Sequence, residues 1–183
     1  MRKTLSLLVS LTAISAVCAA ILAFLNAKTK EPIRVTGERK ALDAASAVMP
    51  SSVVKGKVEK VADGEFVGRD EKGAVAGYAI EGEGKKGYGG PVRLMVGFEA
   101  DAKTVVSYKT LKASETPGLG MKLNEPGFAG QFGGKDASKA LKVTKDDGEI
   151  VPITAATITS RAVCEAIADA QAKARSRAER LGK

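Results

Sequence analysis

The chain has 183 residues, with 29 Lys and Arg against 21 Asp and Glu, and therefore a formal net charge of +8. It contains no histidine, two cysteines and no tryptophan. Without histidine, Ser-His-Asp triads and His-ligated zinc sites are excluded, and two cysteines cannot hold an iron–sulfur cluster unless another chain supplies ligands. Redox chemistry, if present, must therefore use an organic cofactor.

The basic charge invites a nucleic-acid hypothesis, but other features oppose it. Aromatic residues make up only 4% of the chain, and the basic residues are scattered rather than clustered. Base stacking therefore lacks platforms, and we expect no nucleic-acid partner. A basic surface near anionic lipid is at least as compatible with this composition.

An apolar run without charged residues occupies residues 4–25. As a helix it would be about 33 Å long, which is enough to cross the hydrocarbon core of a bilayer. A cleavable signal peptide is the alternative, since the residues around Cys18 could serve a signal peptidase. The run continues beyond the usual length of a signal h-region, however. We therefore predict an uncleaved membrane anchor over residues 1–27, with membrane lipid as its partner.

Charge does not decide the orientation of this anchor. Basic residues stand on both sides of it, namely Arg2 and Lys3 before it and Lys28, Lys30 and Arg34 after it. The positive-inside rule therefore favours neither orientation clearly. Residues 28–37, which include Pro32, are predicted to be a linker, followed by one domain over residues 38–183.

The pattern of this domain is typical of an α+β fold. Residues 38–49 have the apolar spacing of an amphipathic helix that ends at Pro50. Strand-like runs separated by turn signals follow at residues 53–61, 66–69, 74–80, 92–99 and 103–112, with a glycine-rich break at 82–90. Residues 140–150 are predicted to add another strand. Short connections favour an antiparallel sheet with helices flanking it at both ends of the domain.

A hydroxyl-rich turn runs directly into a helix at residues 152–167. The N-terminus of a helix offers unpaired N–H groups and a positive dipole end, which suit a phosphate. Thr154, Thr157, Thr159 and Ser160 gather their hydroxyls at this point. Ser and Thr are also the ordinary N-cap residues, so a capped helix without a ligand is the alternative.

A second unusual string precedes this turn, Glu115-Thr116-Pro117-Gly118-Leu119-Gly120-Met121-Lys122. Proline fixes its own φ, and the two glycines permit left-handed conformations and close backbone approach. Such a loop can bring N–H groups against a flat ring, although a generic turn has the same composition.

Together, these strings resemble the FMN-binding domain of membrane electron-transport subunits, namely the G subunit of Rnf-type complexes and the C subunit of the sodium-pumping NADH:quinone oxidoreductase. Gly87-Tyr88-Gly89-Gly90-Pro91 and residues 131–135 extend the resemblance. It implies FMN joined by a phosphoester to Thr157. The further cofactor-binding residues implied are Thr154, Ala156, Thr159, Glu115, Thr116, Gly118, Leu119, Gly120, Lys122 and Tyr88. A tyrosine that caps the edge of the core is the alternative for Tyr88.

The resemblance also implies a function. It points to a membrane-anchored electron-transfer subunit of an Rnf-type ion-translocating ferredoxin:NAD oxidoreductase complex, with the flavin domain outside the cytoplasmic membrane. Such a subunit works with the other subunits of the complex, needs a flavin transferase for maturation, and is not catalytic alone. No catalytic or metal-ligating residue is predicted. The alternatives are a stand-alone FMN protein, a flavin-containing reductase or regulator, and an anchored binding module without flavin.

Two departures from the family pattern stand near the motifs. Ala155 replaces the usual glycine of the threonine motif, and Ala113 and Ser114 stand where relatives often carry a histidine. The added methyl group matters if residue 155 adopts a positive φ.

Overall fold

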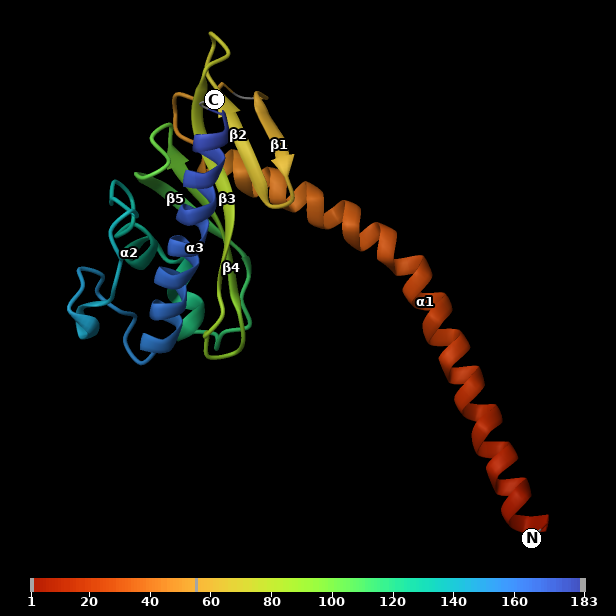
Figure 1. The fold of residues 1–183 in the computed structure, drawn as a ribbon. Coiled ribbons are helices and arrows are strands. Elements are labelled where there is room, and N and C mark those ends of the chain that lie inside the picture. The colour runs from red at the N-terminus through yellow and green to blue at the C-terminus, as the bar shows by residue number, and fades with distance from the viewer. Residues whose placement is uncertain (1, 55, 182–183) are drawn as a thin grey trace. The chain divides into compact units, whose positions relative to one another are not determined.

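A computed structural model describes residues 2–54 and 56–181 of the chain (Figure 1). Met1, Lys55 and residues 182–183, which belong to the expected segments 1–27 and 38–183, lie outside the described residues. The chain divides into two units, Met1–Arg39 and Lys40–Lys183. The described residues of the first unit, 2–39, are helical, and the second unit contains the sheet.

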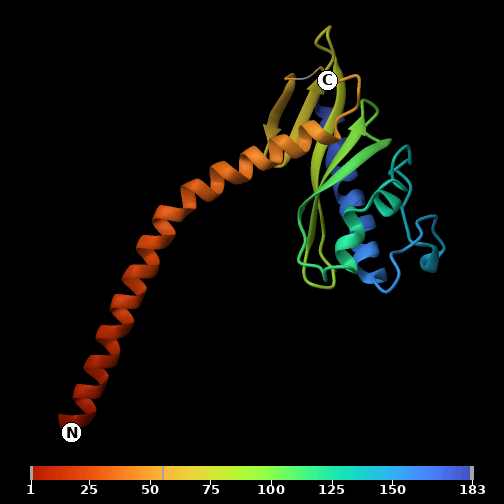
Figure 2. The same cartoon turned by 180° about the vertical axis from the view of Figure 1, so that it is seen from behind.

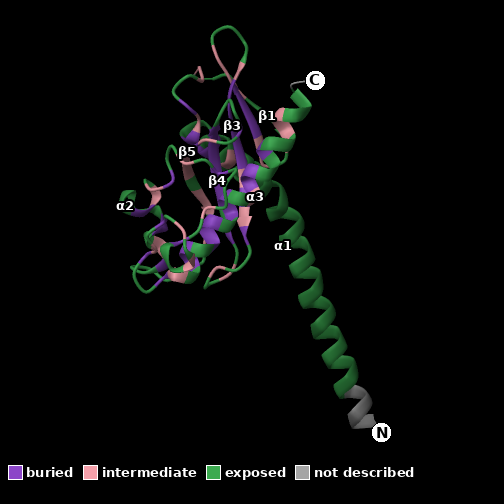
Figure 3. Ribbon diagram, turned by 60° about the vertical axis from the view of Figure 1, so that its left-hand side comes forward, coloured by how far each residue is buried: buried purple, intermediate pink, exposed green. Residues whose placement is uncertain are grey.

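The N-terminal helix α1 runs from Arg2 to Val48. In the described part of the chain it is the one helix long and apolar enough to cross a membrane. Its large apolar side chains from Leu7 to Leu25 are exposed, as Figure 3 shows in green for this stretch. This stretch of α1 therefore presents an apolar surface that no other described residue of the chain covers.

Residues 28–37, where we expect a linker, are helical, and α1 continues through them with Pro32 inside the helix. Arg34 pairs with Glu31 at 2.6 Å and with Glu38 at 2.9 Å, at spacings that place these side chains on one helix face. The predicted helix over residues 38–49 is the end of this same helix.

The sheet contains five antiparallel strands in the order in which they occur in the chain. They are β1 (Val58–Ala62), β2 (Glu65–Arg69), β3 (Val75–Gly84), β4 (Val92–Glu99) and β5 (Val105–Lys112). All five predicted strands are present, and the α+β class with an antiparallel sheet is confirmed. The second strand pairs through Phe66 with Ala79, and the third through Ile80 with Val96, as a continuous meander.

Helix α3 (Thr157–Leu181) packs along β3 and β4 (Figures 1 and 2). The glycine-rich break expected at residues 82–90 begins too early, because Gly82 and Gly84 belong to β3. A Cβ at Gly82 would lie 2.0 Å from the Ala166 carbonyl oxygen, and a Cβ at Gly84 would lie 1.9 Å from that of Ala162. These glycines therefore allow the helix to lie directly on the strand.

The other face of the sheet is covered by the last turns of α1. Ala44, Ala45 and Val48 form a small buried cluster with side chains from the sheet, namely Phe66, Ala79 and Met95. Because both faces are covered, β3 and β4 are buried almost continuously, as the purple strands in Figure 3 show.

Short helical turns connect β5 to α3: η1 (Gly120–Asn124), α2 (Pro126–Ala129) and η2 (Thr144–Asp146). The strand predicted at residues 140–150 is wrong. Only an isolated bridge joins Val143 to Ile150, and Asp147 reverses the chain between them with a φ of 59°. Both bridge residues are buried, and the polar residues between them form the tight turn.

Candidate functional site

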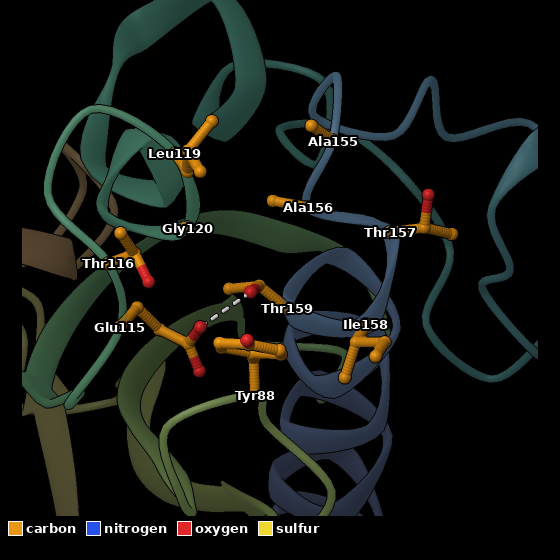
Figure 4. A pocket seen from close by; sticks show the side chains of 10 residues that line it. All are labelled: Tyr88, Glu115, Thr116, Leu119, Gly120, Ala155, Ala156, Thr157, Ile158 and Thr159. Carbon is orange, nitrogen blue, oxygen red and sulfur yellow. Dashed lines mark hydrogen bonds between the residues drawn. The ribbon is translucent and has the colours of Figure 1, made fainter.

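A pocket of about 510 Å³ lies between three segments of the second unit (Figure 4). These segments are the β3–β4 connection, the loop that follows β5, and the start of α3. The residues that line it are Tyr88, Glu115, Thr116, Leu119, Gly120, Ala155, Ala156, Thr157, Ile158 and Thr159. The two strings that the sequence singled out therefore meet in one pocket, although residues 123–151 separate them in the sequence.

One end of the pocket is polar and buried. Glu115 is 6% exposed and Thr159 is 1% exposed, and the Thr159 hydroxyl donates a hydrogen bond of 2.7 Å to Glu115 Oε2. The backbone N–H of Gly89 donates to the other oxygen, Glu115 Oε1, at 3.3 Å. The carboxylate thus joins all three segments, and its hydrogen bonds offset part of the cost of burying it.

Glycines make this convergence possible. A Cβ at Gly89 would lie 1.6 Å from the Ser114 carbonyl oxygen. A Cβ at Gly120 would lie 2.6 Å from Glu115 Oε2 and 2.9 Å from Thr159 Oγ1. Gly118 has a different role, because its φ of +74° shapes the turn and no atom lies near its missing Cβ. Gly120 therefore provides the close backbone approach expected of this loop, and Gly118 provides the left-handed conformation.

The opposite end of the pocket is formed by the turn that begins α3. Ala156 N–H donates to the Ile153 carbonyl at 2.9 Å, while the Ser160 hydroxyl accepts from the Ile153 N–H at 3.0 Å. Thr157 is the first residue of the helix and is half-buried. Figure 4 shows its hydroxyl pointing away from the Glu115–Thr159 pair. The Lys145 ammonium group donates a hydrogen bond of 3.2 Å to this hydroxyl.

Most of the predicted site residues line this pocket. Tyr88, Glu115, Thr116, Leu119, Gly120, Ala156, Thr157 and Thr159 all do. Thr154 and Lys122 instead line a separate pocket of about 400 Å³, and Gly118 shapes the loop without lining either of the two. Tyr88 is 72% exposed, so it does not cap the core and stands at the pocket mouth.

Sequence reasoning missed Ala155 and Ile158 as lining residues and Lys145 as a contact of Thr157. Ala155 and Ile158 lie within the threonine motif, so their position in the sequence could have indicated that they line the site. No such signal marks Lys145, because it lies in a stretch that was predicted to be a strand.

Asp146 and Cys164, both near the start of α3, have shifted pKa values. Arg161 forms a bidentate contact with Asp146 at 2.6 and 2.7 Å, and this hydrogen bonding lowers the pKa of the Asp146 carboxyl. Burial raises the pKa of the Cys164 thiol to about 12, so this group is not a thiolate nucleophile at neutral pH. Among the described residues, no cluster of three or more His, Cys, Asp or Glu could hold a metal ion.

Ala155 has a φ of 61°, the conformation in which the family's usual glycine is at an advantage. We predict that Ala155→Gly raises the free energy of unfolding by about 1 kcal/mol, less a few tenths for the greater entropy of the unfolded glycine. Urea denaturation followed by circular dichroism measures this change. Ala156→Gly is the matched control. Ala156 is buried and does not have a positive φ, so its replacement should destabilise the protein. Equal losses for both variants would contradict the prediction.

Comparisons with known proteins agree with this geometry. A family model described as FMN-binding domain matches residues 87–172, a range that contains every residue of the pocket. The G subunit of the ion-translocating oxidoreductase complex of Methanosarcina acetivorans is 31% identical over 176 residues, covering 91% of this chain and 92% of that protein. The G subunit of the Na(+)-translocating ferredoxin:NAD(+) oxidoreductase complex of Acetobacterium woodii is 32% identical over 174 residues, covering 84% and 83%.

Among solved structures, the crystal structure of Shewanella oneidensis NqrC aligns with a TM-score of 0.52 over 70% of this chain and 72% of that chain. The sequences are 17% identical, so this likeness concerns the fold. The sheet, the pocket and the similarity along nearly the whole chain lead to one conclusion. This chain belongs to the family of G subunits of ion-translocating oxidoreductase complexes and contains an FMN-binding domain.

Proposed function

We propose that this chain is a membrane-anchored electron-transfer subunit of an Rnf-type ion-translocating ferredoxin:NAD oxidoreductase complex, with FMN covalently bound at Thr157. The observation that carries the proposal is the pocket with the Thr157 hydroxyl at its edge, inside the segment that matches the FMN-binding domain. The names of the relatives support the assignment to a complex with other subunits. The chain relays electrons within the complex and is not an enzyme alone.

The pocket fits FMN in size and chemistry. Its volume of about 510 Å³ falls within the usual range for small-molecule sites. Leu119, Ile158 and the Tyr88 ring offer apolar surface to a flat ring system, and the buried Glu115–Thr159 pair offers polar atoms at one end. FMN, when bound, supplies reversible uptake and release of electrons. The protein contributes its position, its exclusion from water and the charges around it.

Thr157 is suited to attachment, because the residue lines the pocket and is only half-buried, which leaves it within reach of an activated phosphate. A flavin transferase would present FAD to this residue. The hydroxyl oxygen of Thr157 would form a bond to the phosphorus on the FMN side of the pyrophosphate. The bond from that phosphorus to the bridging oxygen would break with loss of AMP, and the hydroxyl proton would pass to solvent or to a base of the transferase.

The N-terminal part of α1 supports a single-pass anchor. Residues 1–27 form the anchor in this proposal, residues 28–37 connect it, and residues 38–183 form the flavin domain. The exposed apolar side chains between Leu7 and Leu25 would contact lipid rather than protein. We assign the flavin domain to the extracytoplasmic side on the family resemblance, because the charges that flank the span do not decide it.

Purification from membranes tests this function in one experiment. The full chain, carrying a C-terminal tag and extracted with detergent, should retain its N-terminal residues by intact mass. It should also bring down companion membrane subunits and contain one flavin per chain. A soluble protein with a mature N-terminus near Ala20 would contradict the anchor. A flavin-loaded chain without companion subunits would favour a stand-alone FMN protein.

A further inference from the structure

Lys145 lies beside the hydroxyl of Thr157, outside the set of residues that line the pocket. Its Nζ atom is 3.2 Å from Thr157 Oγ1. The two residues come from different elements, since Lys145 lies in η2 and Thr157 begins α3. A lysine ammonium has three donors and no acceptor, so the threonine oxygen accepts this hydrogen bond.

The turn that carries Lys145 is held against the helix by its neighbour. Asp146 accepts two hydrogen bonds from Arg161, one turn into α3, at 2.6 and 2.7 Å. This bidentate pair neutralises the arginine and fixes the direction from which the lysine approaches. The lysine itself is exposed, and no carboxylate lies within salt-bridge distance of its ammonium in the part of the chain that the structure describes.

The charges at the two ends of the pocket are therefore opposite. The Glu115 carboxyl group, with Thr159 as its partner, stands at one end, and the cation of Lys145 stands next to Thr157 at the other. In Figure 4 the Thr157 hydroxyl points away from Glu115. An anion attached to Thr157 would thus lie next to the Lys145 cation. Repulsion by the Glu115 carboxylate would also keep the anion at the Lys145 end of the pocket.

We propose that Lys145 is a positioning residue that binds the phosphate of the flavin at Thr157. The inference rests on the proposed function, because it takes the phosphate to lie at this hydroxyl. The non-bridging oxygens of a phosphoester are bonded to the same phosphorus as the ester oxygen and lie two bonds from it, so an ammonium in contact with the ester oxygen reaches them without movement of the backbone. The lysine thereby holds the phosphate end of FMN while the ring occupies the pocket.

The test compares FMN with riboflavin, which lacks the phosphate. The full chain is produced without flavin transferase and kept in detergent, and quenching of flavin fluorescence gives the dissociation constant of each ligand. Wild type should bind FMN more tightly than riboflavin. Lys145→Gln should reduce this preference by about fivefold to thirteenfold, which corresponds to the upper value for an exposed ion pair and the lower value for a hydrogen bond to a charged group. Its affinity for riboflavin should stay unchanged.

Two further variants complete the comparison. Lys145→Arg keeps the charge and should restore most of the preference for FMN. Lys139→Gln removes the same charge from an exposed lysine of the same connecting segment and should leave the preference as in wild type. An unchanged preference in Lys145→Gln overturns the proposal. An equal loss of riboflavin affinity also overturns it, because the side chain would then shape the pocket rather than bind the phosphate.

The flavinylated chain gives a second measurement, which decides the matter if neither ligand binds non-covalently. The ³¹P resonance of the phosphodiester should shift in Lys145→Gln and remain in place in Lys139→Gln, and identical resonances in all three proteins overturn the proposal. The two hypotheses fail separately. A wild-type chain that gains no flavin mass with the transferase and FAD refutes attachment at Thr157, whereas the ratio of FMN to riboflavin affinity still reports on Lys145.

Discussion

Replacing Thr157 with alanine is expected to leave a folded chain that carries no covalent flavin. Thr157 is the first residue of α3 and lines the pocket, and Ile158, which follows it, has no hydroxyl group. Alanine removes the oxygen that would form the phosphoester, so the loss should be complete rather than partial. Intact mass after production with a flavin transferase, together with flavin fluorescence on a denaturing gel, measures it.

Thr159 is the competing hydroxyl two residues further on. It is 1% exposed and donates its proton to Glu115 at 2.7 Å, so its oxygen is poorly accessible for transfer. Thr157→Ser should therefore retain the flavin, and Thr154→Ala, which changes an exposed hydroxyl outside the pocket, should retain it as well. FMN found by peptide mapping on Thr159, or fluorescence that survives Thr157→Ala, would refute the assignment.

Gly120→Val is expected to shift the midpoint potential of the flavin by tens of millivolts while covalent FMN remains on the chain. The added Cβ would lie 2.6 Å from Glu115 Oε2 and 2.9 Å from Thr159 Oγ1, so the buried carboxylate must move. Disturbing a hydrogen bond to a charged group costs about 1.5–3 kcal/mol. For a two-electron couple, about 1.4 kcal/mol corresponds to 30 mV if only one redox state feels the change. A redox titration of the purified flavoprotein measures the shift.

Gly118→Ala is the matched control in the same loop. Its φ of +74° makes alanine strained there, but no atom lies within 4 Å of the added Cβ. The control should therefore lose stability and keep its potential. If Gly120→Val leaves both the potential and the flavin absorbance unchanged in a folded protein, the loop does not tune the flavin. Loss of all FMN in this variant would show instead that the flavin transferase also recognises the loop.

Local chemistry in the sequence was sufficient to predict the apolar N-terminal span, the five strands and the start of α3. The run over residues 4–25 has no charge, the strands are separated by turn residues, and the hydroxyl residues around Thr157 precede an apolar helical spacing. The strings around Gly120 and Thr157 also carry the family resemblance, which does not depend on the contact between them.

Other features became visible only in the folded chain, because they depend on partners distant in the sequence. Gly82 has the composition of a loop residue, yet it pairs with Leu94 within β3, and the backbone of α3 occupies the space that a side chain at this position would need. Residues 140–150 look like a strand, but among the described residues they form only the isolated bridge between Val143 and Ile150, and Asp147 turns the chain with a φ of 59°.

The site follows the same rule. The sequence contained the residues of the pocket, whereas packing assigned Gly120 to the close approach of Glu115 and Gly118 to the turn. Packing also brought Lys145 to Thr157, because the Asp146–Arg161 pair ties its turn to the helix. No local pattern marks such a contact. It exists because η2 folds back against the first turns of α3.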